Sequence, residues 1–366
     1  MSGNIRKLGE LVKIRTGKLD ANASSIDGIY PFFTCSVEPL KINSYSFDCE
    51  CVLVAGNGDL NVKYFNGKFD AYQRTYVIES LDKNILDVSY LFCFLNSYIE
   101  VLRKQSIGGV IKYIKLGNLT NALIPLPPIE EQKEISKILK KAEKIVNTNS
   151  KLLSKYDTLI KSRFIEMFGD NPIENGKWKV ESLEDLCKII TDGTHQPPKF
   201  TTSGIPFLFV SNIAGNKITY ETEKYISEQT YAELYKRTPI EIGDLLLSTV
   251  GSYGHPAIVE NDKKFLFQRH IAYLKPKTDL LDSVYFHGAL LSPDAQKQIE
   301  ERVRGIAQKT LNLSEIRKIK IPVPPLSLQN DFASFVQQID KSKFAVQKSL
   351  EKTETLYKSL MQQYFA

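Results

Sequence analysis

The clearest pattern in the chain is an amphipathic stretch that occurs twice. Apolar residues recur about every 3.5 positions from Pro127 to Phe168 and again from Pro324 to Phe365, with Lys and Glu filling the positions between them. A single offset of 324 − 127 = 365 − 168 = 197 residues relates the two copies. Proline suits the first turn of a helix but not its interior, so each stretch is predicted to be a helix of about 40 residues that begins at its prolines. A repeat on this scale indicates a duplicated architecture.

Each predicted helix carries an apolar stripe that one helix cannot cover alone. The other helix has a matching length and pattern, so we expect the two to pair as a coiled coil. Residues 171–323 lie between them and are too many for a loop, so they should form a domain that returns the chain, which favours an antiparallel pair. Asn149 falls in the middle of the stripe, where a buried amide can fix the register of the pair.

The segment before the first helix has the pattern of a β meander with a little helix. A short amphipathic stretch, Ile5–Ile14, opens it, and a helix is predicted at Val88–Arg103. Asn-Gly pairs between apolar runs are strong signals for hairpin turns. The strands and turns predicted in chain order are Tyr30–Thr34, Val52–Ala55, Asn57-Gly58, Asn61–Phe65, Asn66-Gly67 and Tyr72–Ile78.

Residues 171–320 repeat this frame with loops of different length and sequence. Unlike loops on a repeated frame are typical of a protein that recognises two different targets. The segments matched in this way are Leu183–Ile189 with Leu8–Ile14, Ile205–Phe207 with Tyr30–Phe32, Gln268–Tyr273 with Gln73–Ile78, and Arg304–Lys309 with Ser106–Ile111. We therefore predict an α+β fold with a pseudo-two-fold internal repeat, in which two β-rich modules are separated by an antiparallel coiled coil. The predicted division is 1–124, 125–170, 171–321 and 322–366.

Composition narrows the class of protein. Lys plus Arg exceed Asp plus Glu by 48 − 42 = 6, a mild excess that permits an anionic partner without requiring one. The five cysteines include no Cys-x-x-Cys pair, which favours neither a disulfide framework nor a zinc site. No apolar run approaches the length of a membrane span, and the first residues lack the apolar core of a signal peptide. We expect a cytoplasmic protein that does not contact a membrane.

Motifs for catalysis are missing. The chain has no Gly-x-x-x-x-Gly-Lys-Ser/Thr phosphate loop, and Gly56-Asn57-Gly58 is better explained by a hairpin. The two proline pairs that open the helices and a third at Pro197-Pro198 are not preceded by the Asn or Asp of an amino-methyltransferase. The four histidines are never spaced for a metal on a helix. These observations predict a protein that is not an enzyme and that binds neither a metal nor a cofactor.

Loops that combine Gly, Ser/Thr, Asn/Gln and Lys/Arg recur at corresponding places in the two modules. Arg, Lys, Asn and Gln make two-pronged contacts to base edges, while hydroxyl and backbone N–H groups bind phosphate. Taken one at a time, such loops are more often plain solvated turns, but as a repeated set they favour a DNA-binding surface. The candidate DNA-binding residues are Thr16, Lys18, Asn57, Lys63, Arg74, Lys112, Thr194, His195, Asn212, Ser252, Tyr253, Arg269, Arg304, Gln308 and Lys309.

The layout resembles the specificity subunit of type I restriction-modification systems, which has two variable target-recognition domains. In that family each domain leads into a segment of the form Leu/Val-Pro-Pro-Ile/Leu-x-x-Gln and a long helix. Leu126–Gln132 and Val323–Gln329 stand at these positions, and the helix ends at Phe168 and Phe365 also agree. The resemblance covers essentially the whole chain.

The resemblance implies a non-catalytic subunit that binds double-stranded DNA with a bipartite target, one half-site per domain. It further implies assembly with two copies of an S-adenosylmethionine-dependent methyltransferase subunit and with ATP-driven restriction subunits. Two alternatives stay open. One is the recognition part of a type II-like methylase-endonuclease, and the other is a coiled-coil adaptor that binds no DNA.

Overall fold

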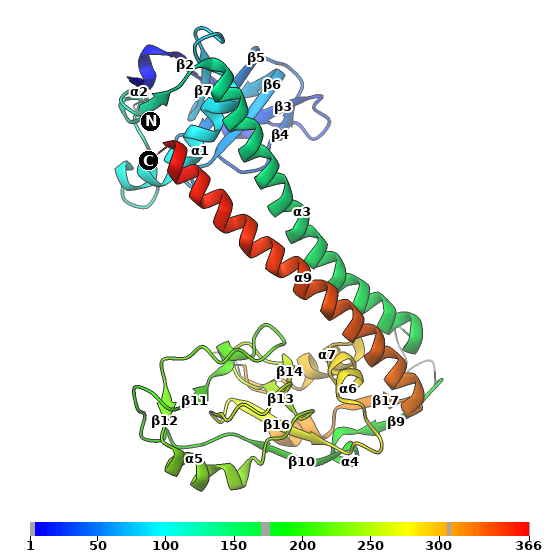
Figure 1. Ribbon diagram of the computed structural model, residues 1–366. Coiled ribbons are helices and arrows are strands. Elements are labelled where there is room, and N and C mark those ends of the chain that lie inside the picture. The colour runs from blue at the N-terminus through cyan, green and yellow to red at the C-terminus, as the bar shows by residue number, and fades with distance from the viewer. Residues whose placement is uncertain (1–3, 170–175, 306–308, 366) are drawn as a thin grey trace. The chain divides into compact units, whose positions relative to one another are not determined.

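The computed structural model describes residues 4–169, 176–305 and 309–365. The chain divides into two compact units (Figure 1). Unit 1 comprises residues 1–151 and 347–366, and unit 2 comprises residues 152–346. Each of the two long helices begins in one unit and ends in the other, so both units contain parts of both helices. The division into four consecutive segments drawn from the sequence stays a prediction.

Unit 1 is built on a six-stranded sheet with the strand order β2-β7-β5-β6-β3-β4, and a separate pair β1-β8. Neighbours are antiparallel except β3 and β6, which run parallel. Helix α1 packs against β5 and β6. The elements are β1 (Asn4–Lys7), η1 (Leu8–Glu10), β2 (Val12–Thr16), η2 (Ala21–Ala23), β3 (Tyr30–Phe33), β4 (Leu40–Ile42), β5 (Phe47–Ala55), β6 (Val62–Ala71), β7 (Thr75–Ser80), α1 (Val88–Gln105), α2 (Leu116–Thr120) and β8 (Leu123–Leu126).

One sequence prediction for unit 1 is wrong in detail. Asn66-Gly67 is not a turn, because both residues lie inside β6 and pair with Glu50 and Cys49 of β5. Gly67 has φ +135°, so glycine serves here to accommodate a local irregularity in a long strand rather than to reverse the chain. The amphipathic stretch Ile5–Ile14 forms a strand, a short turn of 3₁₀ helix and the start of a second strand.

Unit 2 repeats the frame with smaller sheets. One sheet has the order β10-β16-β13-β14, a second has the order β12-β11-β15, and β17 pairs with β9. The elements are β9 (Lys179–Ser182), α4 (Leu183–Leu186), β10 (Cys187–Asp192), β11 (Ile205–Leu208), η3 (Val210–Asn212), β12 (Tyr225–Ile226), α5 (Glu228–Leu234), η4 (Tyr235–Arg237), β13 (Leu245–Ser248), β14 (Pro256–Ile258), β15 (Leu266–Phe267), β16 (Ile271–Pro276), α6 (Ser283–Leu290), α7 (Pro293–Arg302), α8 (Leu313–Arg317) and β17 (Lys320–Val323).

The long helices are α3 (Ile129–Phe168) and α9 (Leu326–Phe365), each of 40 residues. They begin just after their proline pairs and pack together as an antiparallel pair, which confirms the sequence prediction (Figure 1). Asn149 donates from Nδ2 to the Ser349 hydroxyl at 3.2 Å, so its amide does cross the seam. Its side chain is only partly buried, in contrast to the buried amide that the pattern predicts.

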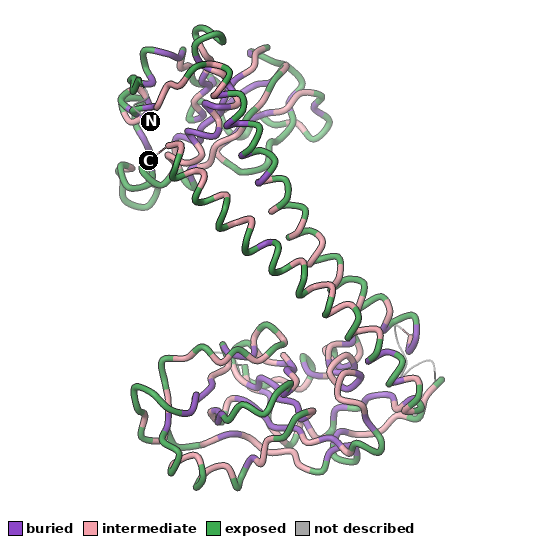
Figure 2. Tube along the Cα trace, viewed as in Figure 1, coloured by how far each residue is buried: buried purple, intermediate pink, exposed green. Residues whose placement is uncertain are grey.

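The ends of the long helices belong to the cores of the units. In unit 1, Phe365 of α9 packs against Tyr90 and Phe94 of α1, with ring centroids 5.2 and 5.9 Å apart. In unit 2, Phe168 of α3 lies against Tyr285 of α6 at 4.8 Å. Figure 2 shows that buried residues concentrate in the sheets and around these helix ends, whereas the middle of each helix is mostly exposed or intermediate. Each helix end is therefore anchored by burial of large aromatic side chains.

A buried glutamine in the first turn of each long helix ties that helix to its unit. Gln132 and Gln329 are both fully buried, and each amide bonds three backbone groups. The partners are the Asp87 N–H and the Ile85 and Pro127 carbonyls for Gln132, and the Asp282 N–H and the Leu280 and Pro324 carbonyls for Gln329, at 2.8–3.0 Å. We call each arrangement a glutamine clasp. The clasp fixes where the helix leaves the unit, because it joins the helix start to the cap of α1 or α6.

Candidate nucleic-acid interface

Backbone hydrogen bonds gather four loops at one edge of the large sheet in unit 1. The Gly17 N–H donates to the Thr75 carbonyl (3.4 Å) and the Gly56 N–H to the Arg74 carbonyl (2.8 Å). The Gly58 N–H donates to the Lys112 carbonyl at 2.9 Å. These bonds join residues 16–19, 56–58, 72–75 and 107–114, which we call the loop edge of unit 1. The ends of β2, β7 and β5 that carry three of these loops are neighbours in the sheet, so loops far apart in the sequence lie close together.

Unit 2 has the same pattern of backbone bonds. The Gly193 N–H donates to the Ile271 carbonyl (3.2 Å), the Thr249 N–H to the His270 carbonyl (3.0 Å) and the Gly251 N–H to the Lys309 carbonyl (3.3 Å). We call residues 192–195, 249–254, 268–271, 304–305 and 309–311 the loop edge of unit 2. The repeat is therefore kept at the level of backbone geometry, although the side chains differ between the two edges.

The backbone bonds of the two turns correct the sequence match between Gln73-Arg74 and Gln268-Arg269. The Thr75 N–H bonds the Tyr72 carbonyl, and the Ile271 N–H bonds the Gln268 carbonyl, so the turns correspond at an offset of 271 − 75 = 268 − 72 = 196. The counterpart of Arg269 is therefore Gln73, not Arg74. By the same offset, the counterpart of Arg74 is His270.

The loop that follows α1 or α7 needs a similar correction. The Ile107 and Tyr113 backbones bond each other in both directions, as do the Arg304 and Thr310 backbones. Arg304 therefore corresponds to Ile107, rather than to Ser106 as the sequence match implied, and the offset is 304 − 107 = 310 − 113 = 197.

Most of the candidate residues lie on the two loop edges. Thr16, Lys18, Arg74 and Lys112 are exposed on the edge of unit 1, where Asn57 is partly exposed. On the edge of unit 2, His195, Ser252, Arg269 and Arg304 are exposed and Thr194 is partly exposed. Among the described residues, no acidic side chain pairs with Lys18, Arg74, Lys112, Arg269 or Arg304. Their charges are available to an anionic ligand.

Two candidates on the edge of unit 2 are engaged with each other. Lys309 forms an ion pair with Glu300 of α7 at 2.8 Å and lies 3.3 Å from the Tyr253 hydroxyl, which itself donates to Glu300. The carboxylate and the hydroxyl raise the pKa of Lys309, so its ammonium stays protonated but partly neutralised. Exposed pairs of this kind are weak and can be exchanged for a phosphate.

Two of the candidates that the structure describes do not belong to an exposed interface. Asn212 is buried, and its amide bonds the Phe209 N–H and the Thr219 and Glu221 carbonyls, so it holds a loop together. Asn212 is therefore not on an exposed surface, in contrast to what its choice as a DNA-binding candidate assumed. Lys63 is partly buried in β6 and donates to Asn61, and burial lowers its pKa. Gln308 lies outside the described residues.

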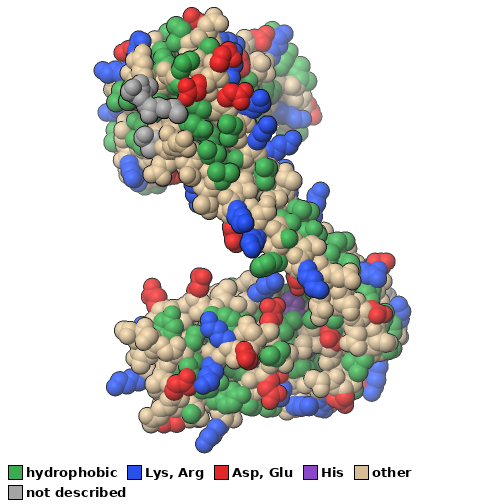
Figure 3. All heavy atoms as spheres, viewed as in Figure 1, with side chains coloured by type: hydrophobic (Ala, Val, Ile, Leu, Met, Phe, Trp, Pro, Cys, Tyr) green, Lys and Arg blue, Asp and Glu red, His purple; other side chains and the backbone are tan. Residues whose placement is uncertain are grey.

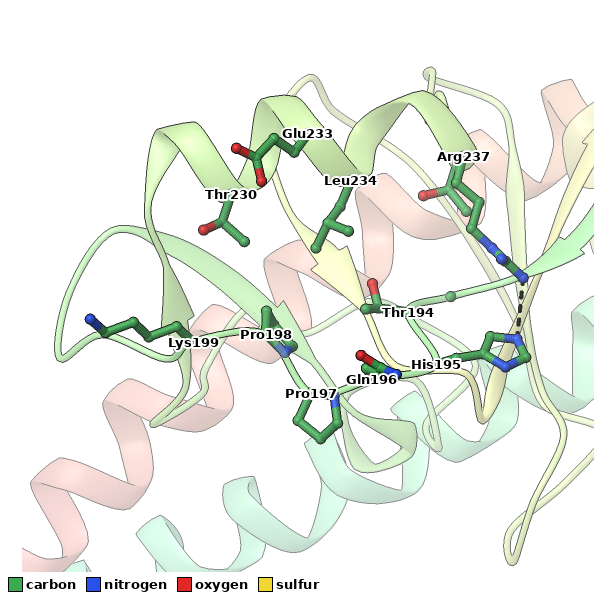
Figure 4. Close-up of a pocket in the computed structure, with 12 residues that line it drawn as sticks. Thr194, His195, Gln196, Pro197, Pro198, Lys199, Thr230, Glu233, Leu234 and Arg237 are labelled. Atoms are coloured by element: carbon green, nitrogen blue, oxygen red, sulfur yellow. Dashed lines mark hydrogen bonds between the residues drawn. The ribbon is translucent and has the colours of Figure 1, made fainter.

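A polar pocket of about 450 Å³ opens beside the edge of unit 2 (Figure 4). The segment 193–199 forms one wall and helix α5 with η4 forms the other. His195 and Arg237 point toward each other, and Arg237 Nη2 lies 3.2 Å from His195 Nε2. Asp192 accepts from both of them, so it holds the guanidinium at the mouth of the pocket. A cation held in place next to hydroxyl and amide side chains suits an anion or a base edge.

Several residues of this surface were not among the sequence candidates. Gln73 and His270 occupy positions equivalent to Arg269 and Arg74, and Arg237 comes from a segment with no counterpart in the sequence matches. Gln73 and His270 could have been found by pairing the turns at an offset one residue longer than the offset that aligns the two Gln-Arg pairs. Arg237 carries no such signal, because its place in the pocket depends on the fold of α5 and η4.

Charge does not outline the surface by itself. On the face drawn in Figure 3, Lys and Arg side chains are interspersed with Asp and Glu side chains over both units.

Across residues 4–169, 176–305 and 309–365, no cluster of three His, Cys, Asp or Glu side chains is arranged to hold a metal ion. No helix in the same ranges combines the length and apolar character needed to cross a membrane. The geometry of the loop edges is thus the main guide to function.

Sequence comparison finds one family model, described as the type I restriction modification DNA specificity domain, which matches residues 4–155 and again 175–354. The specificity subunit of the type I restriction enzyme EcoDI from Escherichia coli is 45% identical over 36% of this chain and 29% of that protein. The chain therefore aligns with less than a third of the length of this relative. The MjaVIII specificity subunit of Methanocaldococcus jannaschii is 23% identical over 97% of this chain and 90% of that protein.

Solved structures show the same fold. The S subunit of a type I restriction-modification system from M. genitalium has a TM-score of 0.69 at 16% identity, with 100% of this chain and 97% of that chain covered. A chain from a structure titled for complex assembly and conformational transition of the type I R-M system has a TM-score of 0.55 at 17% identity. It covers 100% of this chain and 98% of its own.

Proposed function

Because the chain belongs to the family of type I restriction modification DNA specificity domains, we propose that it is the sequence-recognition subunit of a type I restriction-modification complex. Unit 1 reads one half of a bipartite DNA target and unit 2 reads the other. The observation that carries this proposal is the loop edge, which has the same backbone bonds in both units and different side chains on them. A shared frame with unlike side chains is what reading two different half-sites requires.

Equivalent turn positions hold Gln73 in unit 1 and Arg269 in unit 2, and this difference favours half-sites of different sequence. A glutamine side chain matches the two hydrogen-bonding groups that adenine presents in the major groove, whereas arginine matches those of guanine. Gln73 also donates to Asp20 at 2.6 Å, a contact that orients its amide. The exposed cations around them, such as Lys18 and Arg304, supply phosphate contacts that position the duplex without specifying its sequence.

The partners we propose are double-stranded DNA, two methyltransferase subunits and the ATP-dependent restriction subunits. The chain contributes recognition and no chemistry, in keeping with the missing methyltransferase, nuclease and phosphate-loop motifs in its sequence. Purified chain should therefore show no turnover of S-adenosylmethionine in the presence of its target. Turnover by the chain alone would support the methylase-endonuclease alternative.

The test of DNA recognition is binding as a function of salt. We expect the logarithm of the affinity to fall linearly with the logarithm of salt concentration, with a slope of about −0.9 per phosphate contact. A preferred target should emerge by selection from a random duplex library, with two separated half-sites. A coiled-coil adaptor would show neither the slope nor a preferred sequence, and a selected target with a single uninterrupted site would argue against one half-site per unit.

Arg269→Ala is expected to remove discrimination at one base pair of the unit 2 half-site, at a cost of about 1–3 kcal/mol, because a bidentate Arg–guanine contact is lost. Arg269→Lys is the matched control: it keeps the charge and the affinity for random DNA but loses the two-pronged contact. Competition binding against duplexes with every single-base change measures both effects. If Arg269→Ala leaves affinity, base preference and salt slope unchanged, Arg269 has only a structural role.

A further inference from the structure

The loop of residues 107–113 carries apolar side chains that no described part of unit 1 covers. Val110 is 103% exposed, Ile111 62% and Ile107 42%. Large aliphatic residues are among the most often buried types, and a single exposed one needs no explanation. Three within five residues at the end of one loop form a local apolar surface, which we call the apolar tip.

The apolar tip stands on a defined stem. The Ile107 N–H donates to the Tyr113 carbonyl (3.0 Å), and the Tyr113 N–H donates to the Ile107 carbonyl (2.9 Å). The bond between the Gly58 N–H and the Lys112 carbonyl fixes the stem to the rest of the loop edge. Gly108 has φ +117°, and a Cβ there would lie 2.6 Å from the Ile111 carbonyl oxygen. The turn therefore depends on glycine, and the tip is held out from the unit rather than folded back onto it.

Cations flank the apolar tip. Lys104, Lys112 and Lys115 are exposed, and none of them pairs with an acidic side chain in the part of the chain that the structure describes. The neighbouring Arg103 is engaged by Glu100 and Asp59. An apolar centre with basic residues around it is complementary to a duplex, whose phosphates are anionic and whose base-pair faces are apolar.

We propose that the apolar tip is a wedge that inserts Val110 and Ile111 between two adjacent base pairs of the half-site read by unit 1, unstacking that step and bending the duplex. The inference rests on the proposed function and adds to it a mode of recognition. Apolar side chains inserted in this way act at flexible pyrimidine–purine steps, so the wedge makes the deformability of one step part of the target.

The wedge belongs to unit 1 alone. At the offset of 197 residues that relates Ile107 to Arg304, Val110 and Ile111 correspond in sequence to Ala307 and Gln308. The one large aliphatic residue in that stretch of sequence, Ile306, corresponds to Gly109, so the stretch does not repeat the adjacent pair Val110-Ile111. The half-site of unit 2 therefore serves as an internal control within the same complex.

The experiment uses the full chain and duplexes that carry its selected target, with 2-aminopurine placed at each step of both half-sites. We expect fluorescence to rise on binding at one step of the unit 1 half-site and at no step of the other, and the ends of the duplex to approach each other by energy transfer. The double variant Val110→Ser, Ile111→Ser should lose both signals and bind the target about tenfold more weakly, since two apolar side chains no longer leave water. Both residues are exposed, so the thermal unfolding midpoint should not change.

Two further variants separate the wedge from simpler roles. Val110→Ile keeps the apolar surface and should retain the fluorescence signal. Lys112→Gln should weaken binding to all sequences and flatten the salt slope by about 0.9, while the fluorescence at saturation is retained.

Three results would overturn the wedge. One is a double variant that binds with unchanged affinity and fluorescence. A second is loss of the same affinity when thymine is replaced by uracil without any unstacking, which would indicate a contact to the thymine methyl group. A third is loss of association with a protein partner while DNA binding is unaffected. Absence of any salt-dependent DNA binding by the chain would instead overturn the proposed function, and the wedge with it.

Discussion

Gln329→Ala is expected to destabilise unit 2 by about 3 kcal/mol, because it leaves the Asp282 N–H and the Leu280 and Pro324 carbonyls without their partner. Each buried backbone group left unpaired costs about 1–3 kcal/mol, and water entering the site recovers part of that. For a unit of this size the thermal midpoint should fall by about 6–12 °C, measured by circular dichroism or calorimetry.

Gln338→Ala is the matched control, since Gln338 lies on the same helix and is exposed. Its effect should be within about 0.5 kcal/mol of zero. Equal midpoints for the two variants would show that the clasp does not stabilise the helix start. Gln329→Glu tests the geometry further, because a carboxylate can accept from the Asp282 N–H but cannot donate to the two carbonyls.

The second large effect is expected from Gly193→Ala on the loop edge of unit 2. A Cβ at this position would lie 2.2 Å from the Phe267 carbonyl oxygen and 2.5 Å from that of Gln268. Real Cβ atoms do not approach backbone so closely, so the chain must shift and the bonds that join the loops must break. We expect binding to the target to weaken at least tenfold, with recognition lost at the unit 2 half-site and kept at the other.

Gly215→Ala provides the control, because a Cβ there meets nothing within 4 Å. It should leave target binding unchanged. The equivalent substitution in unit 1, Gly17→Ala, places a Cβ 1.7 Å from the Ala71 carbonyl oxygen and should produce the mirror result, with the unit 1 half-site lost. If Gly193→Ala binds the complete target as well as the natural chain does, the loop edge is not the recognition surface.

The repeat and the long helices could be predicted because their signals are local. Proline pairs define where α3 and α9 begin, and the apolar stripe continues without interruption to Phe168 and Phe365. The antiparallel pairing followed from the length of the chain between the helices. The glutamine clasps were visible as Gln132 and Gln329 in the repeated proline motif, but their role was not, because two of the three partners of each glutamine are backbone groups 45–49 residues away in the sequence.

The candidate site was less predictable for a physical reason. The Gln-Arg pair sits one position later in the turn of unit 1 than in the turn of unit 2. Sequence matching therefore aligns Gln73 with Gln268, whereas the backbone bonds place Gln73 opposite Arg269. Asn212 lies in a polar stretch typical of a loop, yet its side-chain amide is hydrogen-bonded to three backbone groups within that loop. Sequence identifies which residue types are present, but only the fold decides whether their polar atoms are still available.

The loops of each loop edge are joined by backbone N–H and carbonyl groups, so the residues that fix the fold of the edge need not be the side chains that determine specificity. Arg74 and His270, or Ile107 and Arg304, differ in size and charge while their backbones make equivalent bonds. A point mutation at such a position removes no partner that the frame needs, so its effect on folding is small. With the proposed function, selection can therefore act on the DNA sequence read by each unit, one base pair and one unit at a time, while Gly17 and Gly193 stay under a separate steric constraint.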